Sequence, residues 1–189
     1  MATFRRFGTR LQGHPCVEKG LPGITQASGS LGQGLSAAAG VALGKKLDGD
    51  DRYVYVLCGD GETEEGQIWE AAMFAAHQNL DHLIAMTDWN GQQIDGTVDA
   101  VAGEGDLESK WKSFGWNVIV ADGHDFDSIL AAFAKAKEST GAPVMILFKT
   151  DMGHGVDFMA GTCKWHGKAP SQDQCKEALA QLEETLGDY

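Results

Sequence analysis

The sequence predicts one α/β domain, in which helices flank a parallel β-sheet. Three features indicate this fold: apolar runs rich in β-branched residues, amphipathic segments that alternate with them, and a length of 189 residues, which suits a single domain. Strands that are buried on both faces give continuous apolar runs, and helices between them produce parallel pairing through right-handed crossovers.

The predicted elements alternate along most of the chain. Helices are expected where apolar residues recur every three or four positions, and strands where short apolar runs end at glycine or polar turns. The predicted helices cover residues 35–46, 68–76, 126–138 and 171–186, and the predicted strands cover residues 53–58, 83–87, 116–120 and 144–148.

The composition excludes several classes of function. A net charge of −12 and an isoelectric point near 4.8 disfavour nucleic acids and anionic membranes as partners. The chain contains no apolar run long enough to span a membrane and does not begin with an apolar signal segment. Its four cysteines form no C-x-x-C pair, which is typical of reduced thiols. We therefore expect a cytoplasmic protein.

Two polar turns at predicted strand ends are candidates for a binding site. They are Gly59-Asp60-Gly61 and Asp88-Trp89-Asn90-Gly91, and the 30 residues from Asp60 to Asn90 suit one strand–helix–strand crossover. Open parallel sheets bind ligands outside the carboxyl ends of their strands. A carboxylate and an amide oxygen beside glycine backbone could hold Mg²⁺ against phosphate oxygens. Alternatively, Asp60 caps a helix and Asn90 only shapes a turn.

The same pattern resembles the thiamin diphosphate-binding motif, in which Gly-Asp-Gly is followed about thirty residues later by Asn. Over nearly its whole length the chain is similar to the diphosphate-binding domain of transketolases. The segments that carry this resemblance are Gly13-His14-Pro15, Gly29-Ser30-Leu31-Gly32-Gln33-Gly34, Glu65-Gly66-Gln67-Ile68-Trp69-Glu70-Ala71, Asn90-Gly91-Gln92-Gln93-Ile94-Asp95-Gly96 and His166-Gly167-Lys168. The resemblance implies the thiamin diphosphate-binding fold of the PP type.

The resemblance also implies the cofactors, which are thiamin diphosphate and Mg²⁺ or Ca²⁺. The implied metal ligands are the side chains of Asp60 and Asn90 and the main-chain carbonyl of Gln92. The implied cofactor contacts are Gly59, Gly61 and Glu62 at the diphosphate, Gly29 and Leu31 at the thiazolium ring, and His166 near the diphosphate.

Four residues are implied in catalysis. His14 would contact the sugar, His166 would lie near the reacting carbon, and Glu65 and Glu70 would join an acidic network between paired active sites across a dimer interface. Glu70 lies in an otherwise alanine-rich helix, where an unpaired carboxylate would be costly. Alternatively, Glu62, Glu64 and Glu65 are only favourable charges at a helix start.

Several residues fall outside the implied site or depart from the family pattern. Trp89 stands where a polar residue is usual, and His154 stands where lysine or tyrosine is more frequent. The histidines that match no family position are interpreted as surface or packing residues: His77, His82, His124 and His154.

We expect residues 1–189 to form a single diphosphate-binding domain, without the usual N-terminal extension and pyrimidine-binding domain of the family. The implied function is transfer of a two-carbon ketol unit from a ketose phosphate to an aldose phosphate, as in the pentose phosphate pathway. We expect a split enzyme, which is inactive without a C-terminal chain that carries the pyrimidine-binding domain and which assembles as a homo-oligomer or heterotetramer. The alternatives are a catalytically silent truncated fragment and a self-associating binding module.

Overall fold

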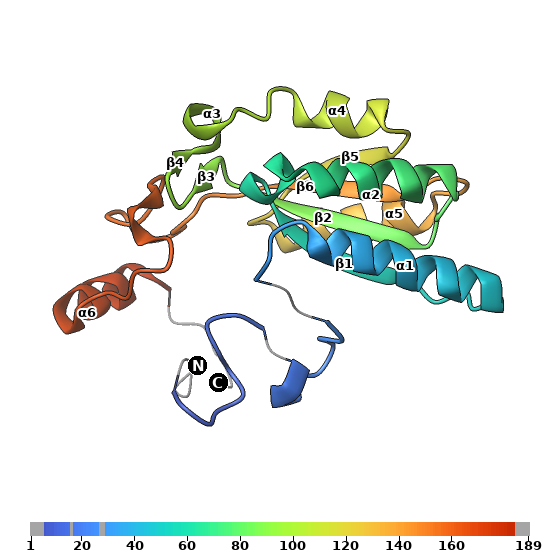
Figure 1. Ribbon diagram of the computed structural model, residues 1–189. Helices are drawn as coiled ribbons and strands as arrows, with labels where there is room; N and C mark the ends of the chain where they lie inside the picture. The colour runs from blue at the N-terminus through green and yellow to red at the C-terminus, as the bar shows by residue number, and fades with distance from the viewer. Residues whose placement is uncertain (1–5, 16, 27–28, 184–189) are drawn as a thin grey trace.

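The computed structural model describes residues 6–15, 17–26 and 29–183, and a parallel four-stranded sheet lies at its centre (Figure 1). The strands are β1 (Val54–Gly59), β2 (Leu83–Trp89), β5 (Asn117–Asp122) and β6 (Val144–Lys149). Their order is β1-β2-β6-β5, and each neighbouring pair is parallel. The predicted parallel α/β fold is confirmed.

Three helices cover one face of this sheet. They are α1 (Gln33–Asp48), α2 (Gly66–His77) and α4 (Leu107–Ser113), and their apolar residues form one core cluster with β1, β2 and β6. Figure 1 shows α1 and α2 side by side against the strands. The ring centroid of Trp111 lies 4.9 Å from those of Trp69 and Trp116. Trp111 and Trp116 are buried in this cluster and act as packing residues.

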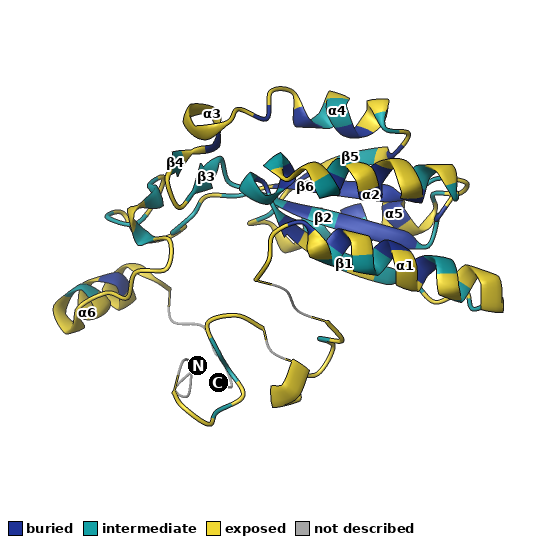
Figure 2. Ribbon diagram, viewed as in Figure 1, coloured by how far each residue is buried: buried dark blue, intermediate teal, exposed yellow. Residues whose placement is uncertain are grey.

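Helix α5 (Phe126–Lys137) packs on the opposite face. Its Ala132 and Ala136 contact a second apolar cluster that includes Ile146 of β6. Figure 2 shows the central strand β2 as buried, whereas the outward sides of the helices are exposed. At the sheet edge, Tyr55 and Leu57 of β1 stay exposed, because α5 covers mainly β5 and β6.

Shorter elements occupy the segments before, between and after these strands and helices. They are η1 (Val17–Lys19), η2 (Gly61–Glu64), β3 (Gln92–Gln93), β4 (Gly96–Thr97), α3 (Val98–Val101), η3 (Cys163–Trp165) and α6 (Gln172–Gln181). A capping box of Ser171 and Gln174 starts α6 where it was predicted. The helix ends before residue 186, because Leu182 already has an extended backbone.

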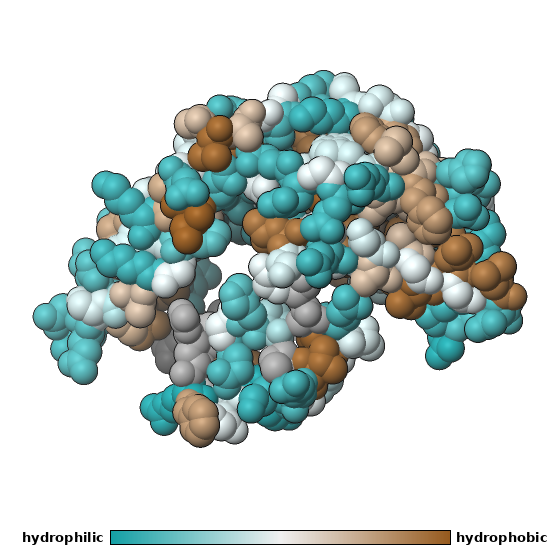
Figure 3. All heavy atoms as spheres, viewed as in Figure 1, coloured by the Kyte–Doolittle hydropathy of each residue, from teal (hydrophilic) through white to brown (hydrophobic). Residues whose placement is uncertain are grey.

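The exposed apolar residues lie among many polar ones. Figure 3 shows brown and tan residues over α1 and α2, where Val41, Leu47, Met73 and Phe74 are exposed. Among the described residues, no helix has both the length and the apolar character that a membrane crossing requires.

Candidate functional site

Asp60 joins the carboxyl ends of two neighbouring strands. It follows β1 with a relative exposure of 1%, and its Oδ1 accepts a hydrogen bond from the Gly61 N–H at 2.8 Å. Its Oδ2 accepts a hydrogen bond from the N–H of Gly91, which lies just beyond β2. The expectation that the Asp60 and Asn90 turns lie together is therefore confirmed. Burial raises the pKa of Asp60, and the two N–H groups only partly offset this.

Asn90 shapes the turn that follows β2. Its Oδ1 accepts a hydrogen bond from the Gln92 N–H at 2.9 Å, which forms an Asx turn before the β3–β4 hairpin. Gly91 has a φ of 71°, a left-handed conformation that glycine adopts without strain. This conformation presents the Gly91 N–H to Asp60. A carboxylate or amide oxygen has two lone pairs, so one hydrogen bond leaves a lone pair free for a cation.

A second buried carboxylate, which the sequence analysis missed, lies behind Asp60. Glu104 is 6% exposed, and its Oε1 accepts a hydrogen bond from the Trp89 Nε1–H at 2.9 Å. The Thr63 hydroxyl donates to the Asp60 carbonyl at 2.7 Å and lies 3.1 Å from Glu104 Oε2. Because the hydroxyl has one proton, Thr63 can donate to either the Asp60 carbonyl or Glu104 Oε2 at one time. Burial, with the nearby charge of Asp60, raises the pKa of Glu104.

Glu62 links the turn after β1 to the glycine-rich segment before α1. Its Oε2 accepts a hydrogen bond from the Gly59 N–H at 3.0 Å, and its Oε1 accepts one from the Gly32 N–H at 2.7 Å. Gly32 is the N-cap of α1 and provides no side-chain cap. The Glu62 carboxylate therefore occupies a place where backbone N–H groups converge on an anion. This side-chain link to Gly32 differs from both predicted roles of Glu62, a backbone contact with the diphosphate and a favourable charge at a helix start.

The space beside Gly61 is closely shaped. A Cβ at this position would lie 2.7 Å from Gln93 Oε1, so the Gln93 side chain would have to move to admit it. Gln93 Nε2 donates to Glu64 Oε2 at 3.2 Å, whereas the buried Glu64 Oε1 has no hydrogen-bond partner within the described parts of the chain. A buried carboxylate oxygen without a partner is costly. This cradle and its hard oxygen donors fit a divalent cation and a phosphate ligand.

The remaining predicted site residues lie at the surface. The exposed ones are Gly29, Leu31, His14, His166, Glu65 and Glu70. The burial argument for Glu70 was wrong, because Glu70 lies on the exposed side of α2 and is hydrated there. The neighbour of His14, Pro15, lines a cavity of about 470 Å³ together with Glu62. Gln67 Nε2 donates to the carbonyl of Leu31 at 2.7 Å, which attaches this segment to α2.

Comparisons with known proteins agree with this geometry. The model of the family described as "Transketolase, thiamine diphosphate binding domain" matches residues 1–187. The chain is 46% identical over 181 residues to the 6-deoxy-6-sulfo-D-fructose transketolase subunit SqwG of Clostridium sp. (strain MSTE9), covering 96% of this chain and 66% of that protein. It is 38% identical to one of the subunits named for an apulose-4-phosphate transketolase, from Phocaeicola vulgatus, covering 97% and 65%.

Solved structures show the same likeness. A transketolase from Campylobacter jejuni superposes with a TM-score of 0.82 at 32% identity, covering 95% of this chain and 29% of that one. A Pichia stipitis transketolase in complex with sedoheptulose 7-phosphate gives a TM-score of 0.83 at 33% identity, covering 93% and 27%. The chain spans about two-thirds of the length of the subunit-type relatives. On all three comparisons, it belongs to the transketolase family and matches the thiamine diphosphate-binding domain of that family.

Proposed function

We propose that this chain is the diphosphate- and metal-binding part of a two-subunit transketolase. The complete enzyme would move a two-carbon ketol unit from a ketose phosphate to an aldose phosphate. One observation carries the proposal: the buried carboxylate of Asp60 holds the ends of β1 and β2 together beside the Asn90 turn. Relatives that are named as transketolase subunits support a partner chain.

In this proposal the cation is Mg²⁺ or Ca²⁺, held by Asp60, Asn90 and the Gln92 carbonyl. A nearby positive charge would stabilise the ionised form of Asp60, which burial disfavours. Because its oxygens are already fixed by backbone N–H groups, little reorganisation would accompany metal binding. Mg²⁺ suits a site with few protein oxygens, since it retains water and phosphate ligands.

Thiamin diphosphate, when bound, supplies the nucleophilic carbon for the transfer. Gly59, Gly61 and Glu62 would contact its diphosphate through backbone groups, because the glycines beside Asp60 let the main chain come close to a ligand. Gly29 and Leu31 would contact the thiazolium ring, and Leu31 offers an apolar side chain that is 51% exposed.

His166 would lie near the diphosphate and the reacting carbon, and His14 would bind the sugar phosphate. Both side chains are exposed and therefore accessible to a ligand.

The partner in this proposal is a second polypeptide that carries the pyrimidine-binding domain, in a heterotetramer or a related oligomer. Glu65 and Glu70 are exposed on or beside α2 and could join an acidic network between paired sites. Residues 1–189 would then act as one diphosphate-binding domain that is inactive alone. The sugars in the relatives' names, a sulfo-sugar and apulose phosphate, refer to those proteins. That this chain acts on sugar phosphates is part of the proposal.

Calorimetry of the full chain with thiamin diphosphate tests this proposal. We expect binding to require Mg²⁺ and to weaken about 10-fold or more in Asp60→Asn. Asp106→Asn is the matched control, since Asp106 caps α4 in an exposed position. Wild-type affinity in Asp60→Asn, or equal losses in both variants, would contradict a coordinated ion. Turnover of a ketose phosphate with an aldose phosphate should appear only after a pyrimidine-domain partner is added, and full turnover by the chain alone would contradict the split enzyme.

A further inference from the structure

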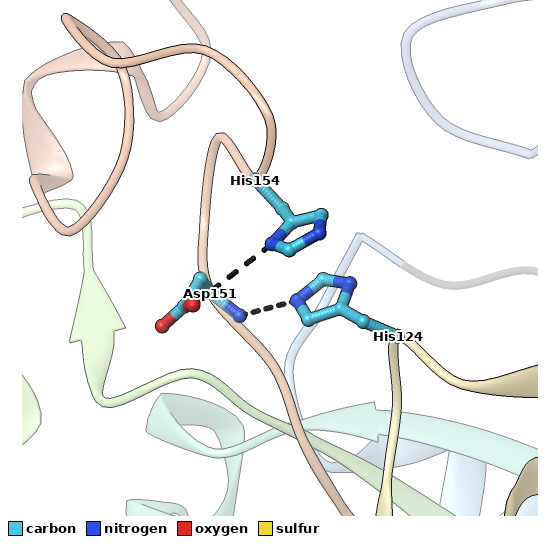
Figure 4. A group of neighbouring side chains, drawn as sticks. All are labelled: His124, Asp151 and His154. Atoms are coloured by element: carbon cyan, nitrogen blue, oxygen red, sulfur yellow. Dashed lines mark hydrogen bonds and ion pairs between the residues drawn. The ribbon is translucent and has the colours of Figure 1, made fainter. Parts of the chain in front are cut away.

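A second group of metal-binding side chains lies at the other end of the sheet's carboxyl edge. His124 follows β5, and Asp151 and His154 follow β6; Figure 4 shows the three side chains gathered together. One potential ligand atom from each side chain lies within 4.8 Å of the others. All three are exposed and border an open cavity of about 540 Å³. We propose that this cluster, the His124 site, binds one borderline transition-metal ion such as Zn²⁺.

The imidazoles are already arranged around the aspartate. The ring centroids of His124 and His154 lie 3.7 Å apart with an interplanar angle of 12°. His154 Nδ1 lies 4.0 Å from Asp151 Oδ2, and His124 Nε2 accepts a hydrogen bond from the Asp151 N–H at 2.7 Å. His124 Nε2 is therefore unprotonated, and its lone pair is held by the Asp151 N–H. A neutral imidazole nitrogen of this kind ligates a metal once its ring turns away from that N–H. Atoms that bind one Zn²⁺ lie about 2.0–2.2 Å from it, so modest side-chain rotations would close the site.

The backbone holds both loops in place. The Gly123 N–H donates to the Lys149 carbonyl at 2.8 Å, which joins the two loops just beyond the paired strands. The His124 N–H donates to Asp122 Oδ1 at 2.8 Å. On the other loop, the His154 N–H donates to the Asp151 carbonyl at 3.1 Å. Ligands on such anchored loops lose less conformational freedom when a metal binds.

The donor set selects the type of metal. Two imidazole nitrogens and one carboxylate suit Zn²⁺ and similar ions, which keep water at open positions. Mg²⁺ and Ca²⁺ prefer oxygen ligands, as at Asp60 and Asn90. The Lys149 ammonium borders the same cavity but lies 5.6 Å from the Trp89 ring centroid in a cation–π contact. The His124 site does not rest on the proposed function, because it shares no ligand with the proposed cofactor site.

A bound ion would connect the loop after β5 to the segment after β6. That segment continues through Val156, which is buried, to η3 and then to His166. Metal binding would therefore stabilise the start of the segment that carries His166, and the melting temperature of the metal-loaded chain should rise.

Isothermal titration calorimetry, in which Zn²⁺ is added to the metal-free full chain, tests the His124 site. We expect one ion per chain, with affinity reduced about 10-fold or more in His124→Gln and in His154→Gln. Controls are His77→Gln, which removes an exposed histidine of α2, and Cys163→Ser, which removes a competing thiol. Neither control should change the affinity, and excess Mg²⁺ should not displace Zn²⁺.

Substitution with Co²⁺ provides a second measurement, since its visible spectrum reports nitrogen ligation. The metal-free variants should melt at the wild-type temperature, because the replaced side chains are exposed. Four results would overturn the proposal: no saturable Zn²⁺ binding, wild-type affinity in both histidine variants, a loss in only one of them, or displacement of Zn²⁺ by Mg²⁺.

Discussion

The two ends of the sheet's carboxyl edge place similar residue types in opposite environments. At the β1–β2 end, Asp60 is buried and both of its oxygens accept backbone hydrogen bonds. At the β5–β6 end, Asp151 is exposed beside two stacked imidazoles. A parallel sheet thus collects polar groups at one edge, whereas burial and donor type decide the chemistry of each group. The buried end suits a hard cation with an anionic ligand, and the exposed end suits a transition metal.

The largest expected effect tests whether the loop after β6, at the exposed end, is loosely packed. Gly153 has a φ of 76°, and a Cβ there would lie 2.6 Å from the backbone of Met159. Gly153→Ala should therefore lower the free energy of unfolding by about 3 kcal/mol, through strain and overpacking. Gly141→Ala is the control, because Gly141 has a φ of 77° with no atom within 4 Å, and should lose about 1 kcal/mol. Equal losses in urea unfolding would show that the loop after β6 is not tightly packed.

The next effect concerns the buried end. Thr63→Val removes the hydroxyl that donates to the Asp60 carbonyl and lies beside Glu104. Leaving buried polar groups unpaired should reduce the free energy of unfolding by about 2 kcal/mol. Thr63→Ser keeps the hydroxyl and should recover most of this loss. If Thr63→Val unfolds like wild type in urea, the hydrogen bonds around Asp60 contribute little to stability.

A smaller effect concerns how the stability of the buried end depends on pH. The pKa of Glu104 is raised by burial, so the metal-free folded chain binds its proton more tightly than the unfolded chain. Below about pH 4 both states are protonated, and the group neither stabilises nor destabilises the fold. As pH rises, the unfolded chain releases this proton while the folded chain keeps it, so stability falls until the raised pKa is passed. Glu104→Gln should therefore melt at a higher temperature than wild type at pH 8 and at a similar temperature at pH 4. A lower melting temperature than wild type at pH 8 would contradict a raised pKa of Glu104.

The smallest effect lies outside both ends and serves as a reference for exposed charges. Hydrogen bonds from Arg52, and then from Lys45, hold the pKa of Asp50 well below its usual range. A lowered pKa stabilises the fold above the unfolded pKa of about 4, and that stabilisation is lost as pH falls. Asp50→Asn should therefore melt slightly below wild type at pH 7. The difference should shrink in strong acid and in high salt, because exposed ion pairs are screened. A difference in melting temperature that does not change with salt would show that packing, and not the charge of Asp50, causes it.

Patterns in the sequence predicted the parts of the fold that bury continuous apolar surface. The four strands of the sheet end within two residues of their predicted limits, because runs such as Val144–Lys149 are largely apolar. The hairpin of β3 and β4 was missed, since two-residue strands show no periodicity. Helix α4 was missed as well, because only Leu107 and Trp111 mark its buried side.

The candidate site was predicted where it depends on topology and missed where it depends on side-chain contacts. The Asp60 and Asn90 turns lie together because the strands before them are neighbours, which the 30-residue spacing indicated. Glu104 contacts Thr63, which is 41 residues away in the sequence, and Trp89, which is 15 residues away. No local sequence pattern encodes such contacts. One signal was present: glycines flank Glu104 just as they flank Asp60.

Anomalous diffraction from crystals of the full chain, grown with thiamin diphosphate and with Mn²⁺ in place of Mg²⁺, tests the central claim most directly. We predict a metal peak within direct coordination distance of an Asp60 carboxylate oxygen and of Asn90 Oδ1, with the diphosphate on the same ion. A metal bound elsewhere, with Asp60 still paired only to the N–H groups of Gly61 and Gly91, would contradict the account.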